Sequence, residues 1–193
     1  MNSKSKRQHI HERNRKQKLR TNFIWGGLVL AVLAIIGVII WQGVRPAAGE
    51  SIQIMAGSSG HIPVDSDPGE YNSNPPTSGP HYPEVARARF YDRNSYTFPA
   101  GYLVHNLEHG YVIFWYNCDL LDEAGCANLK EQIQTSMDDL GGVKLIAYPW
   151  PSLDVPLVMT SWGRLQRFEK FDEQQAKAFY HANRNRSPEP NAP

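Results

Sequence analysis

The sequence contains only two cysteines, Cys118 and Cys126. Seven residues separate them, a spacing that belongs neither to the Cys-x-x-Cys motif of dithiol oxidoreductases nor to zinc fingers. Thiol–disulfide exchange and a thiolate metal site are therefore the weaker interpretations of this pair.

Charged residues are absent from residues 23–41, a run of nineteen residues. At ~1.5 Å per residue, such a helix is ~28 Å long, close to the ~30 Å hydrocarbon core of a bilayer. Trp25 and Trp41 stand near its ends, as interfacial aromatic residues do. A cleaved signal peptide is the alternative, but this run is longer than a usual signal sequence and no good cleavage site follows it. We expect an uncleaved transmembrane helix over residues 23–44.

Acidic residues are nearly absent from the N-terminal tail, residues 1–22. The first twenty residues have a net charge of +7, which leaves −6 for the rest of a chain whose total is +1. The positive-inside rule predicts a cytoplasmic N-terminus and an extracytoplasmic domain in a single-pass cell-membrane protein. The basic tail then sets topology, so we expect the bilayer and other membrane proteins as partners and no nucleic acid.

This topology changes the interpretation of the two cysteines. Outside the cytoplasm, Cys118 and Cys126 are expected to be oxidised to each other, since they are the only pair available. Closing this short loop would stabilise the fold by roughly 2 to 3 kcal/mol.

The exported part divides by composition into a linker at 45–62, a globular domain at 63–186 and a disordered tail at 187–193. Six prolines between Pro63 and Pro83 predict an irregular arm that packs across the domain. The ordered core is expected to start near Tyr102. Its hydrophobic periodicity predicts strands at 111–116, 143–148, 157–161 and 164–168, and helices at 128–140 and 172–183.

The order β-α-β-β-β-α predicts an α/β domain, with α+β as the alternative, and a parallel first strand pair with a right-handed crossover. Residues 111–183 resemble a thioredoxin-like layer in this pattern, including a proline, Pro156, before the third strand. The sequence differs from thioredoxins because it lacks Cys-x-x-Cys and room for a middle helix. Redox function does not follow from this likeness.

The richest chemistry lies at His105-Asn-Leu-Glu108-His109-Gly110, which matches the H-x-x-E-H pattern of inverted zinc proteases. That pattern requires a helix, whereas the flanking residues indicate a strand. In a strand, His105 and His109 would be ~13 Å apart at ~3.3 Å per residue, too far to share a metal. A turn or one helical turn would bring them together.

Should they meet, His81 on the proline-rich arm is the natural third ligand and Glu108 the fourth ligand or an acceptor for an imidazole N–H. We therefore predict a zinc or copper site made of His81, His105, His109 and Glu108. Met159 would complete a copper-type set or else fill the core. A hydrogen-bonded structural cluster and acid–base catalysis remain alternatives, and His61 is interpreted as a surface residue.

Four segments together resemble the family called domain of unknown function 3105, over roughly residues 60–190. They are Pro75-Pro-Thr-Ser-Gly-Pro-His81-Tyr-Pro, Val104-His-Asn-Leu-Glu-His-Gly110, Thr160-Ser-Trp-Gly-Arg164 and Ser187-Pro-Glu189. Members are typically exported or membrane-anchored bacterial proteins without an established activity. The resemblance implies this topology and leaves the chemistry open.

Two functional hypotheses follow for the membrane-anchored domain. The first is an accessory domain that binds a transition metal, and the second is a non-catalytic interaction module of a membrane complex with structural histidines. Thiol–disulfide exchange is a third, weaker hypothesis. No residue is assigned a catalytic role, and the sequence favours a binding role over an enzymatic one.

Overall fold

The computed structural model describes residues 18, 22–37, 48–58, 60–92 and 99–193. The chain forms two compact units, Met1–Arg45 and Pro46–Pro193. In the first unit residues 22–37 are helical. Within the described ranges, no helix is both long enough and apolar enough to cross a membrane. Residues 38–44 of the predicted span 23–44, and nearly all of the predicted basic tail, lie outside the described residues.

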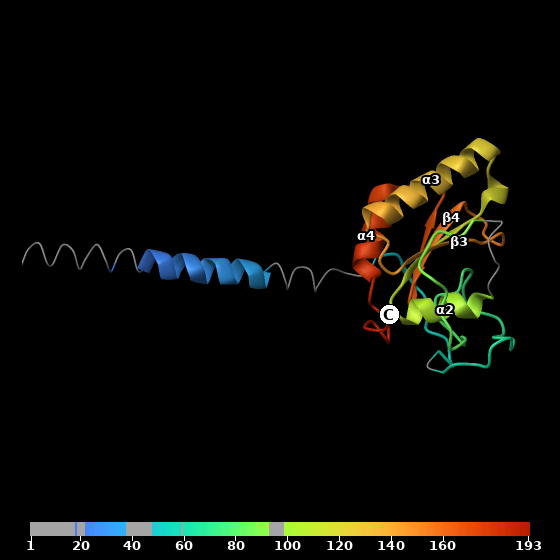
Figure 1. Cartoon of the computed structure of the whole chain (residues 1–193), viewed down its shortest axis with the longest axis horizontal. Coiled ribbons are helices and arrows are strands. Elements are labelled where there is room, and N and C mark those ends of the chain that lie inside the picture. The colour runs from blue at the N-terminus through green and yellow to red at the C-terminus, as the bar shows by residue number, and fades with distance from the viewer. Residues whose placement is uncertain (1–17, 19–21, 38–47, 59, 93–98) are drawn as a thin grey trace, which may run out of the picture. The chain divides into compact units, whose positions relative to one another are not determined.

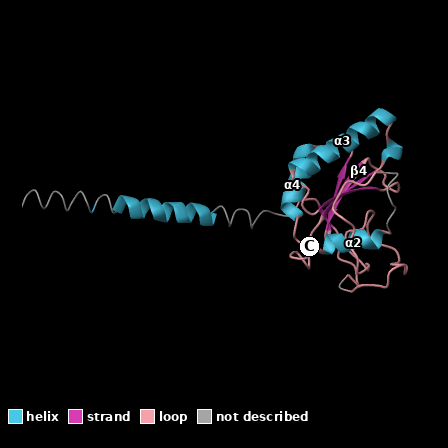
Figure 2. Ribbon diagram, in the orientation of Figure 1, coloured by secondary structure: helices cyan, strands magenta, loops and turns pink. Residues whose placement is uncertain are grey.

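The second unit is a mixed α and β domain built on one five-stranded sheet (Figures 1 and 2). The strand order is β1-β5-β4-β2-β3, with β2 and β3 parallel and the other pairs antiparallel. The strands are β1 (Glu50–Ser51), β2 (Val112–Tyr116), β3 (Leu145–Pro149), β4 (Leu157–Ser161) and β5 (Arg164–Phe168). The helices are α2 (Ala100–Glu108), the 3₁₀ turn η1 (Cys118–Leu120), α3 (Glu123–Asp139) and α4 (Glu173–Asn183).

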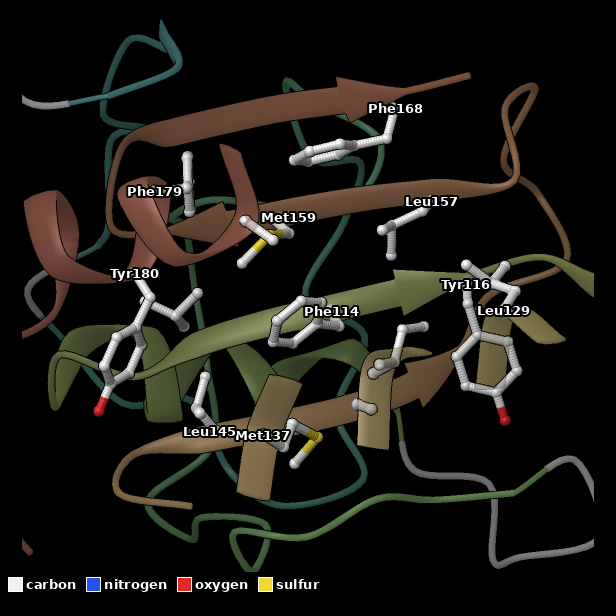
Figure 3. Packing of buried hydrophobic residues seen from close by; sticks show 14 residues of the cluster. Phe114, Tyr116, Leu129, Met137, Leu145, Leu157, Met159, Phe168, Phe179 and Tyr180 are labelled. Carbon is white, nitrogen blue, oxygen red and sulfur yellow. The ribbon is translucent and has the colours of Figure 1, made fainter. Parts of the chain in front are cut away.

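Strand β2 is buried along its whole length because helices cover both faces of the sheet. Phe114 and Tyr116 point toward α3 and α4, in one apolar cluster with Met159 of β4 (Figure 3). Ile113 and Trp115 point to the other face, where they join Leu103 and Leu107 of α2 in a second cluster. This alternation follows from the two-residue period of a strand.

The predicted core elements after residue 110 are confirmed. The strands at 157–161 and 164–168 have the predicted bounds, and β2 and β3 form the predicted parallel pair. Asp122 explains why α3 starts five residues before its predicted start, because its side chain accepts a hydrogen bond from the Gly125 N–H and caps the helix. Among the described residues, the cis peptide bond is Asn74–Pro75.

The prediction that the residues before Gly110 flank His105 as a strand is wrong, although an ordered element does start near residue 102. Residues 100–108 form α2, and Leu103 and Leu107, four residues apart, place one face of this helix on the sheet. Gly110 then ends the helix with φ +82°, while the N–H groups of Gly110 and Tyr111 donate to the carbonyls of Leu107 and Asn106. This pair of bonds is a Schellman motif, so the aromatic strand begins only after the glycine.

The proline-rich arm is irregular and packs on the domain, as predicted. The Asn106 side chain of α2 accepts from the Ala86 N–H and donates to the Ala86 carbonyl, both at 2.9 Å. Tyr91 donates its N–H to Ala147 at the edge of β3. These contacts bring residues 60–92 across α2 and the sheet edge.

Part of the predicted linker at 45–62 belongs to the sheet. Glu50 and Ser51 pair with β5, and the Ala48 carbonyl accepts a hydrogen bond from Asn183. The composition of this segment is typical of a flexible linker, so the sequence does not indicate its long-range pairing. Residues 45–47 and 59 of this linker lie outside the described residues.

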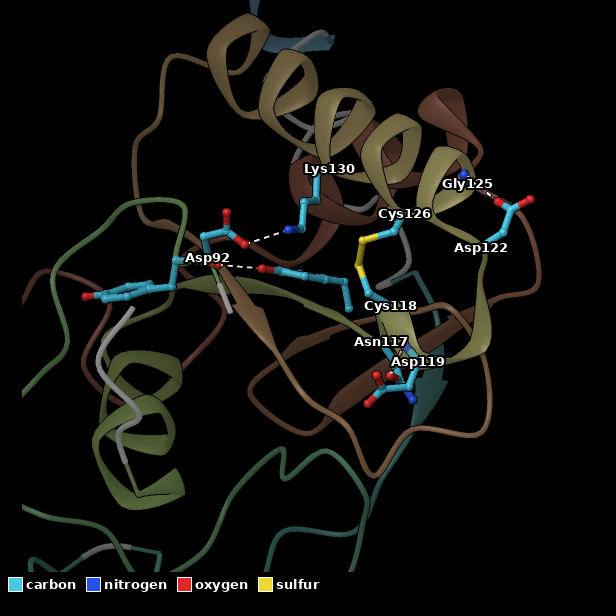
Figure 4. The surroundings of a disulfide bond; sticks show 10 residues. Asp92, Asn117, Cys118, Asp119, Asp122, Gly125, Cys126 and Lys130 are labelled. Atoms are coloured by element: carbon cyan, nitrogen blue, oxygen red, sulfur yellow. Dashed lines mark hydrogen bonds and ion pairs between the residues drawn. A yellow bond between two sulfur atoms is a disulfide. The ribbon is translucent and has the colours of Figure 1, made fainter. Parts of the chain in front are cut away.

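Cys118 and Cys126 form a disulfide that joins η1 to the first turns of α3, with their Cα atoms 5.1 Å apart (Figure 4). The predicted pairing is confirmed. Cys118 packs against the apolar cluster under α3 and α4. The disulfide thus braces the connection between β2 and α3.

Candidate metal centre

Four side chains from the arm and α2 converge on one point. One ligand atom each from His61, His81, His105 and Glu108 lies within 4.8 Å of all the others. Three of these residues were predicted as ligands from the sequence. His61 takes the place that the prediction gave to His109.

The helix α2 supplies His105 and Glu108. Residues three apart share a face of a helix, so the two side chains project toward the arm together. Both side chains are about 5% exposed. A carboxylate is rarely buried in this way without a partner. The helical geometry that H-x-x-E-H requires is therefore present, contrary to the strand interpretation.

His81 is fully buried and held through both ring nitrogens. Its Nδ1 lies 2.8 Å from the Gly79 carbonyl oxygen, which can only accept, so Nδ1 carries the hydrogen. Its Nε2 lies 2.8 Å from Glu108 Oε2. A backbone carbonyl on one nitrogen, with the other directed at the site, is the arrangement that orients histidine ligands for metals.

His61 reaches the site because its segment pairs with that of His81. The two residues form a parallel β-bridge, and the Ile62 N–H donates to the His81 carbonyl at 2.8 Å. The ring centroid of His61 lies 5.0 Å from that of His81 and 4.7 Å from that of His105. Its side chain is 46% exposed, so the site is open to solvent on this side. His61 is exposed, as predicted for a surface residue, but it also lies against the buried histidines, which the sequence did not indicate.

His105 is the histidine whose protonation is most disfavoured. Burial, followed by the nearby His109, His81 and His61, lowers its pKa from 6.5 to about 4. The Glu84 carbonyl accepts a hydrogen bond from the ring, while Nδ1 has no hydrogen-bond partner in the described structure. A neutral imidazole with a free nitrogen is the form that binds metals.

His109 lies beside the site and outside this group. Its ring centroid is 4.4 Å from that of His105, but both nitrogens face the C-terminal segment. Nδ1 lies 3.2 Å from the Pro193 carbonyl oxygen, and Nε2 lies 3.4 Å from Glu189 Oε2. Its assignment as a ligand is not supported by this geometry, because its nitrogens already have partners.

Met159 does not join the histidines. It is completely buried in the cluster under α3 and α4, whereas His105 and Glu108 are carried by α2 on the opposite face of the sheet. Of the two interpretations of Met159, core filling is the one that the structure supports.

Three imidazoles and one carboxylate are a common ligand set for zinc and also suit copper(II). The buried Nδ1 of His105 and the tautomer set at His81 both fit such an ion. A cation could take the place of the proton that His81 and Glu108 share across 2.8 Å. The residues therefore suit a divalent transition metal.

Comparison with known proteins gives a family and no activity. No curated protein and no solved structure matches the chain. A family model described as "Protein of unknown function (DUF3105)" matches residues 64–193, which include His81, His105 and Glu108 but not His61. The match covers most of the sequence, and the chain therefore belongs to the DUF3105 family.

Proposed function

We propose that the domain binds one divalent transition metal ion, zinc or copper, through His61, His81, His105 and Glu108. The observation that carries this proposal is the convergence of four ligand atoms within 4.8 Å of one another. Residues far apart in the sequence supply them, so the fold itself creates the site.

The alternative is a purely structural cluster, and His105 argues against it. An unsatisfied buried polar atom costs ~1 to 3 kcal/mol, and Nδ1 of His105 is such an atom. Packing three imidazole rings together is also unfavourable whenever two of them are positively charged, because the like charges repel each other. A bound cation would remove both costs, since the neutral rings would then be its ligands.

The ion would enter from the side of His61. His81, His105 and Glu108 are buried, whereas nearly half of the His61 side chain is exposed. His61 is then the ligand that exchanges most easily with solvent. This arrangement supports a role in binding or passing on an ion, and no residue is assigned a catalytic role.

The membrane anchor and the outward orientation are part of the same proposal. The uncharged run at 23–41, the basic residues before it and the disulfide support them. Protease added to intact cells should degrade the domain and leave a short anchored fragment. Full protection of the domain in intact cells would contradict this orientation.

The sheet order β5-β4-β2-β3, with a helix joining the parallel pair, supports a thioredoxin-like arrangement of the core. The spacing of Cys118 and Cys126 does not favour thiol exchange. We therefore treat the core as a scaffold that carries the arm and α2.

The test is metal analysis of the full-length chain, produced in an oxidising compartment and purified in mild detergent. Zinc and copper(II) are loaded separately, excess ion is removed, and bound metal is counted per chain. One tightly bound ion and a melting temperature that falls with chelator are expected. The absence of stoichiometric metal after loading, with unchanged melting in chelator, would refute the proposal.

The same experiment tests the second candidate, an interaction module with structural histidines. Its support is the His81–Glu108 hydrogen bond, which needs no ion. This candidate predicts a folded, metal-free chain that purifies with a membrane partner through residues 21–45. A metal-dependent rise in melting temperature would contradict it.

A further inference from the structure

Residues 185–193 lie against the C-terminal end of α2, next to the proposed metal ligands. The Asn185 N–H donates to the Gly110 carbonyl at 3.0 Å, and the Glu189 N–H donates to the Glu108 carbonyl at 3.1 Å. The second bond reaches the backbone of a proposed ligand. The composition of residues 187–193 predicts disorder, whereas the structure shows specific contacts with this segment.

Lys144 ties this segment to the helix. Its Nζ donates to the carbonyls of His109, Pro190 and Ala192 at 2.7, 2.9 and 2.8 Å, which uses all three of its hydrogens. The His109 carbonyl is at the end of α2, where a cation also interacts favourably with the helix dipole. One ammonium group thus bridges the helix end and the segment.

His109 makes the side-chain contact with the same segment. Glu189 and Pro193 lie against its two ring nitrogens. Within H-x-x-E-H, His105 and Glu108 therefore face the proposed ion, while His109 faces residues 185–193. This division explains why the third polar residue of the motif is not among the converging ligands.

Gly110 permits the close approach. A Cβ atom there would lie 2.6 Å from the Cα of Asn185, and the φ of +82° is strained for other residues. The backbone of residue 185 can therefore pack directly on the helix end. The segment is fitted to this position by backbone, side-chain and charge contacts together.

We infer that residues 185–193 are a strap that fixes the end of α2 and slows the loss of the metal ion. This inference rests on the proposed metal site. Glu108 is the last residue of α2, and helix ends fray unless other groups hold them. Fraying would displace the Glu108 carboxylate and then His105, so releasing the strap should speed the loss of the ion.

The test is the rate of zinc release from the loaded full-length chain to an excess of coloured chelator, well below the melting transition. Lys144→Met should release zinc about tenfold faster, in the range found when residues that support metal ligands are removed. Lys144→Arg, which keeps charge and donors, should restore part of the slow release. Lys177→Met is the matched control, because in the described part of the chain Lys177 pairs with Asp139 and Glu173 on the exposed surface of α3 and α4, away from the strap.

A second variant keeps the test decisive if Lys144→Met does not fold. Glu189→Gln keeps Lys144 and weakens the contact with His109, and it should speed zinc release several-fold. Wild-type release rates in both variants, or in Glu189→Gln alone if Lys144→Met does not fold, would overturn the strap while leaving the metal site intact. A wild-type chain that binds no zinc would overturn the proposed function and the strap with it.

Discussion

The Nε2 atom of His81 lies 2.8 Å from Oε2 of Glu108, and both side chains are buried. One comes from an irregular arm and the other from the last residue of α2, 27 positions later. This pair holds the arm to the helix and forms the centre of the proposed metal site. Its removal should therefore affect both stability and metal binding.

His81→Ala should lower the free energy of unfolding by roughly 2 to 4 kcal/mol, because it leaves the buried Glu108 without its close partner. The same variant should lose the metal-dependent rise in melting temperature. Urea unfolding with and without zinc measures both effects. His181→Ala is the control, since His181 is exposed on α4, and an equal loss of stability there would contradict the account.

His61→Ala and His109→Ala should differ in their effect on zinc binding. His61 is exposed, so its loss should change the free energy of unfolding by less than about 1 kcal/mol while weakening zinc binding at least tenfold. His109→Ala should leave one zinc ion per chain. Titration with a competing zinc indicator measures both, and loss of stoichiometric binding in His109→Ala alone would instead support the H-x-x-E-H ligand set.

The metal-free chain should become less stable as the pH falls from about 6.5 to about 4. Burial lowers the pKa of His105 to about 4, so over this range the unfolded chain binds a proton that the folded chain does not. The unfolded state is therefore favoured as the pH falls, and the effect is absent above the unfolded pKa. Urea unfolding across this range should show a smaller pH slope in His105→Gln, and an unchanged slope would contradict this origin.

Replacing Cys118 and Cys126 together by serine should lower the free energy of unfolding by roughly 2 to 3 kcal/mol, through the entropy of the opened loop. Zinc stoichiometry should stay at one per chain, because the disulfide joins β2 to α3 whereas the ligands come from the arm and α2. Loss of metal in this variant under conditions where it is folded would show that the two regions are coupled.

The sequence predicts the elements whose signal is local. Strands β2 to β5 and helices α3 and α4 follow from the period of their apolar residues and from caps such as Asp172, which accepts from the Gln175 N–H. Helix α2 was missed because the apolar residues before Gly110 continue into the aromatic strand without a visible change of period. The Schellman turn at Gly110 separates the two elements in space.

The missed features of the site are long-range. The β-bridge to His81 brings His61 to the other ligands, and no sequence pattern around residue 61 predicts that pairing. The segment 187–193 looks disordered by composition, yet Lys144, more than forty residues earlier, holds it in place. His109 was predicted as a ligand because the spacing of a motif cannot show which of its side chains face an ion and which pack against another segment of the protein.

The X-ray absorption spectrum of the zinc-loaded full-length chain reports the ligands of the ion itself. We expect one zinc per chain, bound by three imidazole nitrogens and one carboxylate oxygen at ~2.0 to 2.2 Å. His61→Ala should remove one imidazole from this spectrum, whereas His109→Ala should remove none. A chain without stoichiometric zinc, or a zinc ion with fewer than three imidazoles in the wild type, would contradict the proposed metal site.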